Sequence, residues 1–216
     1  MIIGFAGKAA SGKTTAARYL AERLPGQVEI LPMAQVLRGE VEEFIREVGA
    51  EQHVPLIYGD QEDKVRVFYV NRKKACELCP AWKDFIEMNW DIQDKTSETA
   101  VSVRLILQWW GTEYRRAQDP DYWTKAWEKQ VQKLDLDHLH VLVDDVRFAN
   151  ELDVISRNGG RFVRIIRPGF DGANNHSSEN SLDDYDGWEL VIDNDGTLEQ
   201  FKEKVAELLL PLLAGE

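Results

Sequence analysis

Eight residues near the start of the chain have the types and spacing of a loop that binds nucleotide phosphates. Residues 7–14 read GKAASGKT and match the pattern G-x-x-x-x-G-K-[ST] in full. A glycine-bounded turn of this kind directs backbone N–H groups at phosphate oxygens, and the N-terminus of the following helix adds the positive end of its dipole. Lys13 is expected to reach the β- and γ-phosphates, and the Thr14 hydroxyl to ligate Mg²⁺. The pattern therefore predicts binding of a nucleoside triphosphate.

The elements on either side of this loop support the prediction. The apolar residues 2–6 are typical of a buried strand, and residues 15–24 carry Ala17, Leu20 and Leu24 at helical spacing before Pro25-Gly26. The alternative is a chance glycine turn before an ordinary helix. This alternative is disfavoured because the motif, the strand before it and the helix after it all fit a phosphate-binding loop.

A pair of carboxylates is the second feature with clear chemistry. Asp144 and Asp145 end the apolar run 140–143, which predicts a buried strand. Because ligands bind beyond the carboxyl ends of parallel strands, these residues are expected beside the phosphate loop, where one of them can hold Mg²⁺. The alternative is that they cap the following helix. Arg147 follows at once, and its spacing fits either bracing the helix or stabilising charge during transfer.

Two other clusters could bind a phosphorylated ligand. In residues 108–116 (QWWGTEYRR) the arginines suit phosphate, the polar side chains suit a base or sugar, and a tryptophan could stack on a base. The alternative places the tryptophans in the core and the arginines on a solvated face. Residues 176–179 (HSSE) follow Arg164 and Arg167, in a polar loop that is either a mobile lid over the triphosphate or ordinary surface. Arg38 is a weaker candidate for an acceptor phosphate.

Composition narrows the class of ligand. The 216 residues are 44% hydrophobic and 30% charged, with a formal net charge of −12. The acidic balance argues against nucleic acid as a partner, since that needs a basic surface. No apolar run approaches the ~20 residues that span a bilayer, and no signal peptide is evident. We expect a cytoplasmic enzyme of small anionic metabolites, without a membrane partner.

The two cysteines, Cys76 and Cys79, form a lone C-x-x-C. A structural zinc site needs four ligands, and no second pair follows at the usual spacing. We therefore expect two reduced thiols. The alternative is a metal site that His53 or a second chain completes.

The remaining pattern predicts an α/β fold. Strands are expected at 28–33, 140–145, 162–166 and 189–192, and helices at 38–50, 99–117, 120–134 and, behind a capping box at Thr197 and Gln200, from 198 to the end. Their alternation favours a mainly parallel sheet with helices on both faces. We expect one domain over 1–216, with an irregular insertion at about 51–98 and a lid-like loop at about 167–187. The insertion's apolar surface could serve a homodimer interface, a lid or fold stability.

Together these pieces resemble the bacteriophage-type deoxynucleoside monophosphate kinases, within the P-loop nucleoside monophosphate kinase group. Six segments carry the resemblance: 7–14 (GKAASGKT), 33–38 (MAQVLR), 108–116 (QWWGTEYRR), 119–123 (DPDYW), 143–151 (VDDVRFANE) and 176–179 (HSSE). Residues 51–98 lie outside it. Two features depart from the family pattern. One is the tryptophan pair, and the other is Ala149, where the pattern has proline.

The resemblance implies transfer of the ATP γ-phosphoryl group to a deoxynucleoside 5′-monophosphate, with Mg²⁺ held by Thr14 and Asp144. Lys13, Arg147, Asp144 and Asp145 are the expected catalytic residues, and by the resemblance Arg147 would also line the acceptor site. The residues implied to bind ATP are Gly7, Lys8, Ala10, Ser11, Gly12, Lys13, Thr14, Thr15, Arg164 and Arg167. Those implied to bind the acceptor are Arg38, Gln108, Trp109, Gly111, Thr112, Glu113, Arg115, Arg116, Asn150, His176 and Glu179. The alternatives are a dephospho-coenzyme A or nucleoside kinase, or a nucleotide-dependent switch ATPase.

Overall fold

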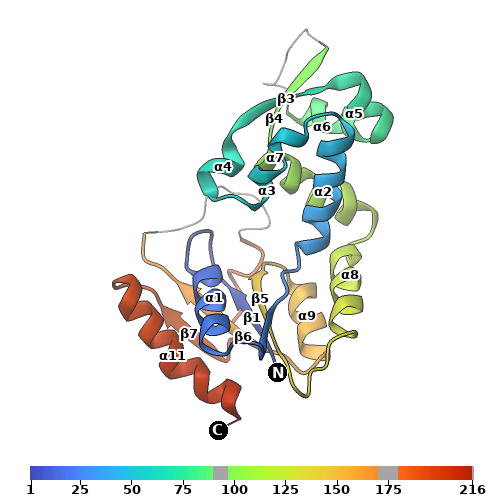
Figure 1. Ribbon diagram of the computed structural model, residues 1–216. Coiled ribbons are helices and arrows are strands. Elements are labelled where there is room, and N and C mark those ends of the chain that lie inside the picture. The colour runs from blue at the N-terminus through green and yellow to red at the C-terminus, as the bar shows by residue number, and fades with distance from the viewer. Residues whose placement is uncertain (90–96, 170–179, 216) are drawn as a thin grey trace. The chain divides into compact units, whose positions relative to one another are not determined.

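The computed structural model describes residues 1–89, 97–169 and 180–215 (Figure 1). The chain divides into two compact units, the first made of Met1–Met33 and Thr124–Glu216 and the second of Ala34–Trp123. The insertion expected at about 51–98 lies inside the second unit. That unit begins before residue 51 and ends after residue 98. Within the described residues, no helix is long and apolar enough to cross a membrane.

The first unit is built on a five-stranded parallel sheet. Its strands are β1 (Ile2–Ala6), β2 (Val28–Ile30), β5 (His140–Val146), β6 (Arg161–Ile166) and β7 (Leu190–Asp193). They lie in the order β2-β5-β1-β6-β7, and each neighbouring pair is parallel. The predicted α/β class with a parallel sheet is confirmed, and β1 with its loop lies at the centre.

Helices cover both faces of this sheet. They are α1 (Lys13–Arg23), α8 (Tyr122–Val131), α9 (Ala149–Arg157) and α11 (Leu198–Ala214). Ile3 and Phe5 of β1 belong to a buried cluster with residues of α1 and α11. Ile2 and Ala6 belong to a second cluster with residues of α8 and α9. Because side chains alternate along a strand, β1 contributes to both cores.

The closing helix α11 begins where the capping box predicts. The Thr197 hydroxyl accepts from the Gln200 N–H at 3.2 Å, and the Gln200 side chain accepts from the Thr197 N–H at 2.9 Å. Phe201, Val205 and Leu209 of this helix are buried against the sheet. The box fixes the start of the helix, and the apolar face fixes its orientation.

The second unit is mainly helical, with one two-stranded antiparallel sheet. Its elements are α2 (Gln35–Glu47), η1 (Glu51–His53), α3 (Pro55–Tyr58), α4 (Gln61–Val65), β3 (Val67–Asn71), α5 (Arg72–Leu78), α6 (Trp82–Met88), β4 (Glu98–Ser102), α7 (Val103–Gln108) and η3 (Trp109–Arg116). Its core is aromatic, with Trp82 in ring contact with Phe44, Phe85 and Trp109. The stretch expected to be irregular therefore holds short elements around this core.

The helix predicted over 99–117 is partly wrong. Residues Glu98–Ser102 form β4, which pairs with β3. The β-branched Thr99 and Val101 are buried and suit a strand, and the Ser102 hydroxyl accepts from the Leu105 N–H at 3.4 Å to cap α7. The helical run then continues as the π-helix η3.

Other boundaries differ by two or three residues. Strand β2 ends at Ile30 rather than at residue 33, and α2 begins and ends three residues before the predicted 38–50. Helix α8 begins at Tyr122 rather than at Pro120. The Asp119 carboxylate accepts from the Asp121 N–H at 3.0 Å and so closes a turn ahead of the helix.

Two adjacent leucines of α11 test the packing of this helix against the sheet of the first unit. Leu209 is fully buried, whereas Leu208 is 38% exposed. We expect Leu209→Ala to lower the free energy of unfolding by about 2–5 kcal/mol, because it leaves a cavity. Leu208→Ala should change it by about 0.5 kcal/mol or less. Urea unfolding measures both, and equal losses would contradict the packing of α11 described here.

Candidate active site

The loop between β1 and α1 has a backbone path that requires glycine. Gly7 and Gly12 have φ angles of 139° and 114°, and Ala10 also has a positive φ, 62°. A Cβ atom on Gly7 would lie 2.3 Å from the carbonyl oxygen of Ile165 in β6. One on Gly12 would lie 2.8 Å from the Asn194 side-chain nitrogen. The motif glycines are therefore needed both for their dihedral angles and for close approach to the sheet.

Side chains from the ends of two other strands hold this loop. Asn194, just after β7, donates to the Ser11 carbonyl at 2.9 Å. Arg167, just after β6, donates to the Ala10 carbonyl at 3.3 Å. The N-cap of α1 is Gly12, which has no side chain to accept from the first turn, so the positive end of the helix dipole faces the loop. The result is a braced loop whose helix end favours anions.

Lys13 is folded over the loop rather than extended into solvent. Its Nζ donates to the carbonyl oxygens of Gly7 and Lys8, both at 2.7 Å, and the residue is 7% exposed. These two contacts fix the ammonium group above the loop. A positive charge is thus held where the motif predicts nucleotide phosphates.

Thr14 and Asp144 meet at the carboxyl ends of β1 and β5. The Thr14 hydroxyl donates to Asp144 Oδ2 at 2.6 Å, and the residue Asp144 is 7% exposed. Asp144 Oδ1 is buried and has no hydrogen-bond partner among the residues that the structure describes. A hydroxyl and a carboxylate with an unused buried oxygen are ligands that Mg²⁺ accepts, so the residues fit this ion.

The described residues hold no group of three or more His, Cys, Asp or Glu side chains arranged for a metal. Mg²⁺ sites in phosphoryl transfer use one or two carboxylates together with substrate phosphates, and they need no all-protein cage.

The other predicted carboxylate, Asp145, has a different position. Its Oδ1 accepts from the Met33 N–H at 2.7 Å and so holds the chain that follows β2. The start of α9 is capped by Glu151, which is buried and accepts from the N–H groups of Arg147 and Phe148 at 2.6 and 3.1 Å. Sequence analysis missed Glu151, although an acid three residues after a helix N-cap is a recognisable capping signal.

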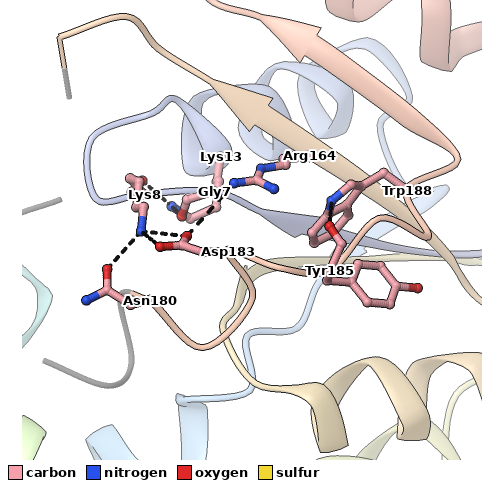
Figure 2. A network of polar contacts seen from close by, with 8 residues as sticks. All are labelled: Gly7, Lys8, Lys13, Arg164, Asn180, Asp183, Tyr185 and Trp188. Carbon is pink, nitrogen blue, oxygen red and sulfur yellow. Dashed lines mark hydrogen bonds and ion pairs between the residues drawn. The ribbon is translucent and has the colours of Figure 1, made fainter. Parts of the chain in front are cut away.

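A hollow that is open to solvent lies beside the loop. It is lined by Ala6, Gly7, Lys8, Val146, Arg147, Arg164, Leu182, Asp183 and Trp188. Figure 2 shows Lys8, Arg164 and Asp183 at the loop. Three cationic side chains gather here in a chain of net charge −12. This concentration fits an anionic ligand.

Sequence analysis also missed Asn194, Asp183 and Trp188. Asn194 follows a parallel strand, so the rule that places ligands beyond strand ends could have found it. Asp183 and Trp188 lie in a segment without hydrophobic periodicity, and no comparable signal marks them.

In the second unit, Arg115 is held by an acid and three aromatic rings. Glu40 Oε2 accepts from Arg115 Nε at 2.8 Å and from Trp110 Nε1 at 2.9 Å, while its Oε1 accepts from the Tyr122 hydroxyl at 2.5 Å. This hydrogen bond and burial raise the pKa of Tyr122. The Arg115 guanidinium lies 4.8–5.9 Å from the ring centroids of Tyr114, Tyr122 and Trp110. Arg115 therefore braces η3 instead of standing on a solvated face.

Trp109 is a core residue of this unit. It is 4% exposed and stacks on Tyr114 with ring centroids 5.2 Å apart. This position favours the core alternative over base stacking. The second unit also carries the predicted acceptor residues Arg38, Gln108, Gly111, Thr112, Glu113 and Arg116, whereas Asn150 lies in α9 of the first unit. His176 and Glu179 lie outside the described residues.

The two cysteines are free thiols. Cys79 is buried, which raises the pKa of its thiol. The His53 ring stacks on Phe68, with centroids 4.3 Å apart. The interpretation of Cys76 and Cys79 as two reduced thiols stays a prediction.

The need for glycine at position 7 is testable with a matched control. Gly7→Ala and Gly26→Ala both place a side chain at positive φ, but nothing lies within 4 Å of a Cβ on Gly26. We expect Gly7→Ala to lower the free energy of unfolding by about 2 kcal/mol more than the control, because its Cβ clashes with backbone. It should also weaken ATP binding. If both substitutions had equal effects in urea unfolding and in ATP titration, that result would contradict the close approach of Gly7 to β6.

Similarity to known proteins extends well beyond the phosphate loop. The sequence model of the deoxynucleotide monophosphate kinase family matches residues 53–205, more than half of the chain. A protein of Acanthamoeba polyphaga mimivirus, provisionally named for the same activity, is 28% identical over 220 residues, 95% of this chain and 94% of that protein. The deoxynucleotide monophosphate kinase of Enterobacteria phage T4 is 32% identical over 110 residues. That match covers 50% of this chain and 45% of the phage enzyme.

A solved structure, the dephospho-CoA kinase of Campylobacter jejuni, is similar over 98% of this chain and 96% of that chain, with a TM-score of 0.48 and 13% identity. At that score, nothing about activity or substrate follows from the likeness. The family match does not depend on this structural likeness. The match agrees with the phosphate loop, Asp144 and the cationic hollow described above. The chain belongs to the deoxynucleotide monophosphate kinase family and is a nucleotide kinase.

Proposed function

We propose that this kinase transfers the γ-phosphoryl group of ATP to a deoxynucleoside 5′-monophosphate and so supplies diphosphates for DNA synthesis. The observation that carries the proposal is the pairing of Thr14 with the buried Asp144 at 2.6 Å, beside a loop over which Lys13 is held. Family membership supports the acceptor class. The cytoplasm, the host's if the chain is phage-encoded, is the proposed location.

The chain's own residues would act mainly by position and charge. Lys13, already fixed over the loop, would neutralise charge on the phosphates, and the α1 N-terminus would add its dipole. Mg²⁺, held by Thr14 and Asp144, would neutralise further phosphate charge. No general base is required, because an acceptor phosphate oxygen is already ionised near neutral pH.

Arg147 is the first-unit residue best placed to contact a transferring or acceptor phosphate. It lines the hollow with Lys8 and Arg164, and Glu151 fixes its backbone. A guanidinium suits phosphate because it offers several donors in one plane. In the second unit, Arg38 and the polar residues of 108–116 are proposed acceptor contacts on the strength of family membership.

Other reactions predict different behaviour. A nucleoside kinase would need a base near the acceptor hydroxyl and would phosphorylate nucleosides. A switch ATPase would hydrolyse ATP slowly without any acceptor. A dephospho-coenzyme A kinase would be inactive on nucleoside monophosphates. The cationic hollow favours a phosphorylated acceptor over a nucleoside or over hydrolysis without an acceptor.

A coupled assay of ADP release tests the proposal. It uses ATP and Mg²⁺ with each common deoxynucleoside and ribonucleoside monophosphate in turn, and a control without acceptor. We expect release that depends on at least one deoxynucleoside monophosphate. Release that no monophosphate stimulates would overturn the proposed function.

Replacing Lys13 tests how much the phosphate loop contributes to the rate of phosphoryl transfer. We expect Lys13→Ala to lower kcat by about 100-fold or more, because it removes a fixed charge from the phosphates. Lys129→Ala, an exposed lysine of α8, should leave kcat unchanged. Circular dichroism checks that both variants are folded. Near-normal turnover of a folded Lys13→Ala protein would contradict the assigned role.

A further inference from the structure

Residues 180–188 contact the phosphate loop through charge. Both carboxylate oxygens of Asp183 lie within 2.7 Å of Lys8 Nζ, and Asn180 Oδ1 accepts from the same group at 2.8 Å. Arg164 Nη2 lies 3.9 Å from Asp183. Figure 2 shows Asp183 between Lys8 and Arg164. One carboxylate therefore bridges two of the cations that line the hollow.

Apolar contacts also anchor the same segment. Leu182, Tyr185 and Trp188 pack against the core shared by β1, β5 and α9. Trp188 Nε1 donates to the Tyr185 carbonyl at 2.8 Å, and Arg164 lies over the Trp188 ring at 5.5 Å. The segment can thus keep its anchor at Trp188 while Asp183 changes partner.

Asp183 binds cationic side chains that the phosphates of a nucleotide would also bind. Lys8 lies in the phosphate loop, and Arg164 lies on β6 beside Ala6, the last residue of β1. Phosphates carry more charge than one carboxylate and bind guanidinium in a bidentate manner. The Lys8 and Asp183 side chains are 21% and 45% exposed, so their ion pair is weak. A carboxylate left beside bound phosphates would also be repelled.

We propose that Asp183 is a built-in competitor of the nucleotide phosphates. When ATP binds, Lys8 and Arg164 exchange the carboxylate for phosphate oxygens, and Asp183 leaves the loop while the apolar anchor holds. Occupancy of the loop is thereby coupled to the position of residues 180–188, and ATP binds less tightly than the loop alone would allow. The proposal rests on the proposed function, since it takes the loop to be the ATP site.

Asp183→Asn, with Asp184→Asn as the matched control, tests the competition. Both residues are exposed acids of the same turn, and each change removes one negative charge. We expect Asp183→Asn to tighten ATP binding about two- to five-fold, the range of an exposed ion pair. Asp184→Asn should change it less than 1.5-fold, as expected where long-range charge is screened. Titration calorimetry without acceptor measures both, and unchanged or weaker binding by Asp183→Asn would overturn the proposal.

Hydrogen exchange provides a second test that needs no variant. In the wild-type protein, ATP should accelerate exchange of the peptide that covers residues 180–188, because the bridge to Lys8 is lost. In Asp183→Asn, the same peptide should exchange faster before ATP is added. Slower exchange of the wild-type peptide with ATP would contradict displacement.

The two proposals fail in different ways. If the wild-type protein transfers phosphate to monophosphates but Asp183→Asn binds ATP like the control, only the competition is wrong. If Asp183→Asn binds ATP more tightly while no monophosphate stimulates ADP release, the competition stands and the acceptor assignment is wrong.

Discussion

The site depends on one steric constraint, the close approach of the phosphate loop to β6. The Ile165 carbonyl lies so near Gly7 that a Cβ atom could not fit, and the positive φ of Gly7 and Gly12 carries the chain from β1 into α1 within a few residues. This path sets the start of α1, and therefore the positions of Lys13 and Thr14. Asn194 and Arg167 brace the same loop, so β6 and β7 also serve the site.

Charge is the second organising feature. A chain of net charge −12 gathers Lys8, Lys13, Arg147 and Arg164 around one loop. The nearby acids have separate partners: Asp144 meets Thr14, Asp145 holds the chain after β2, and Asp183 pairs with Lys8. The site is thus locally positive while the protein as a whole is acidic.

Local sequence predicted most of the first unit because its signals are local. Strand β1, helix α1 and the capping box of α11 are set by neighbouring residues, and the structure confirms them. The second unit was harder to predict. Residues Glu98–Ser102 form a strand because β3 pairs with them, and Arg115 is braced because Glu40, 75 residues earlier, meets it. Asp183 reaches Lys8 across 175 residues, a contact that no local pattern encodes.

The central claim is that Thr14 and Asp144 hold the metal that accompanies ATP. Titration calorimetry of ATP with and without Mg²⁺, on the wild-type protein and on Asp144→Asn, tests it most directly, with the exposed Asp153→Asn as control. We expect Mg²⁺ to tighten ATP binding by wild-type and Asp153→Asn proteins about 10-fold or more, and by Asp144→Asn far less. An equal Mg²⁺ effect in all three proteins would contradict the assignment of this site.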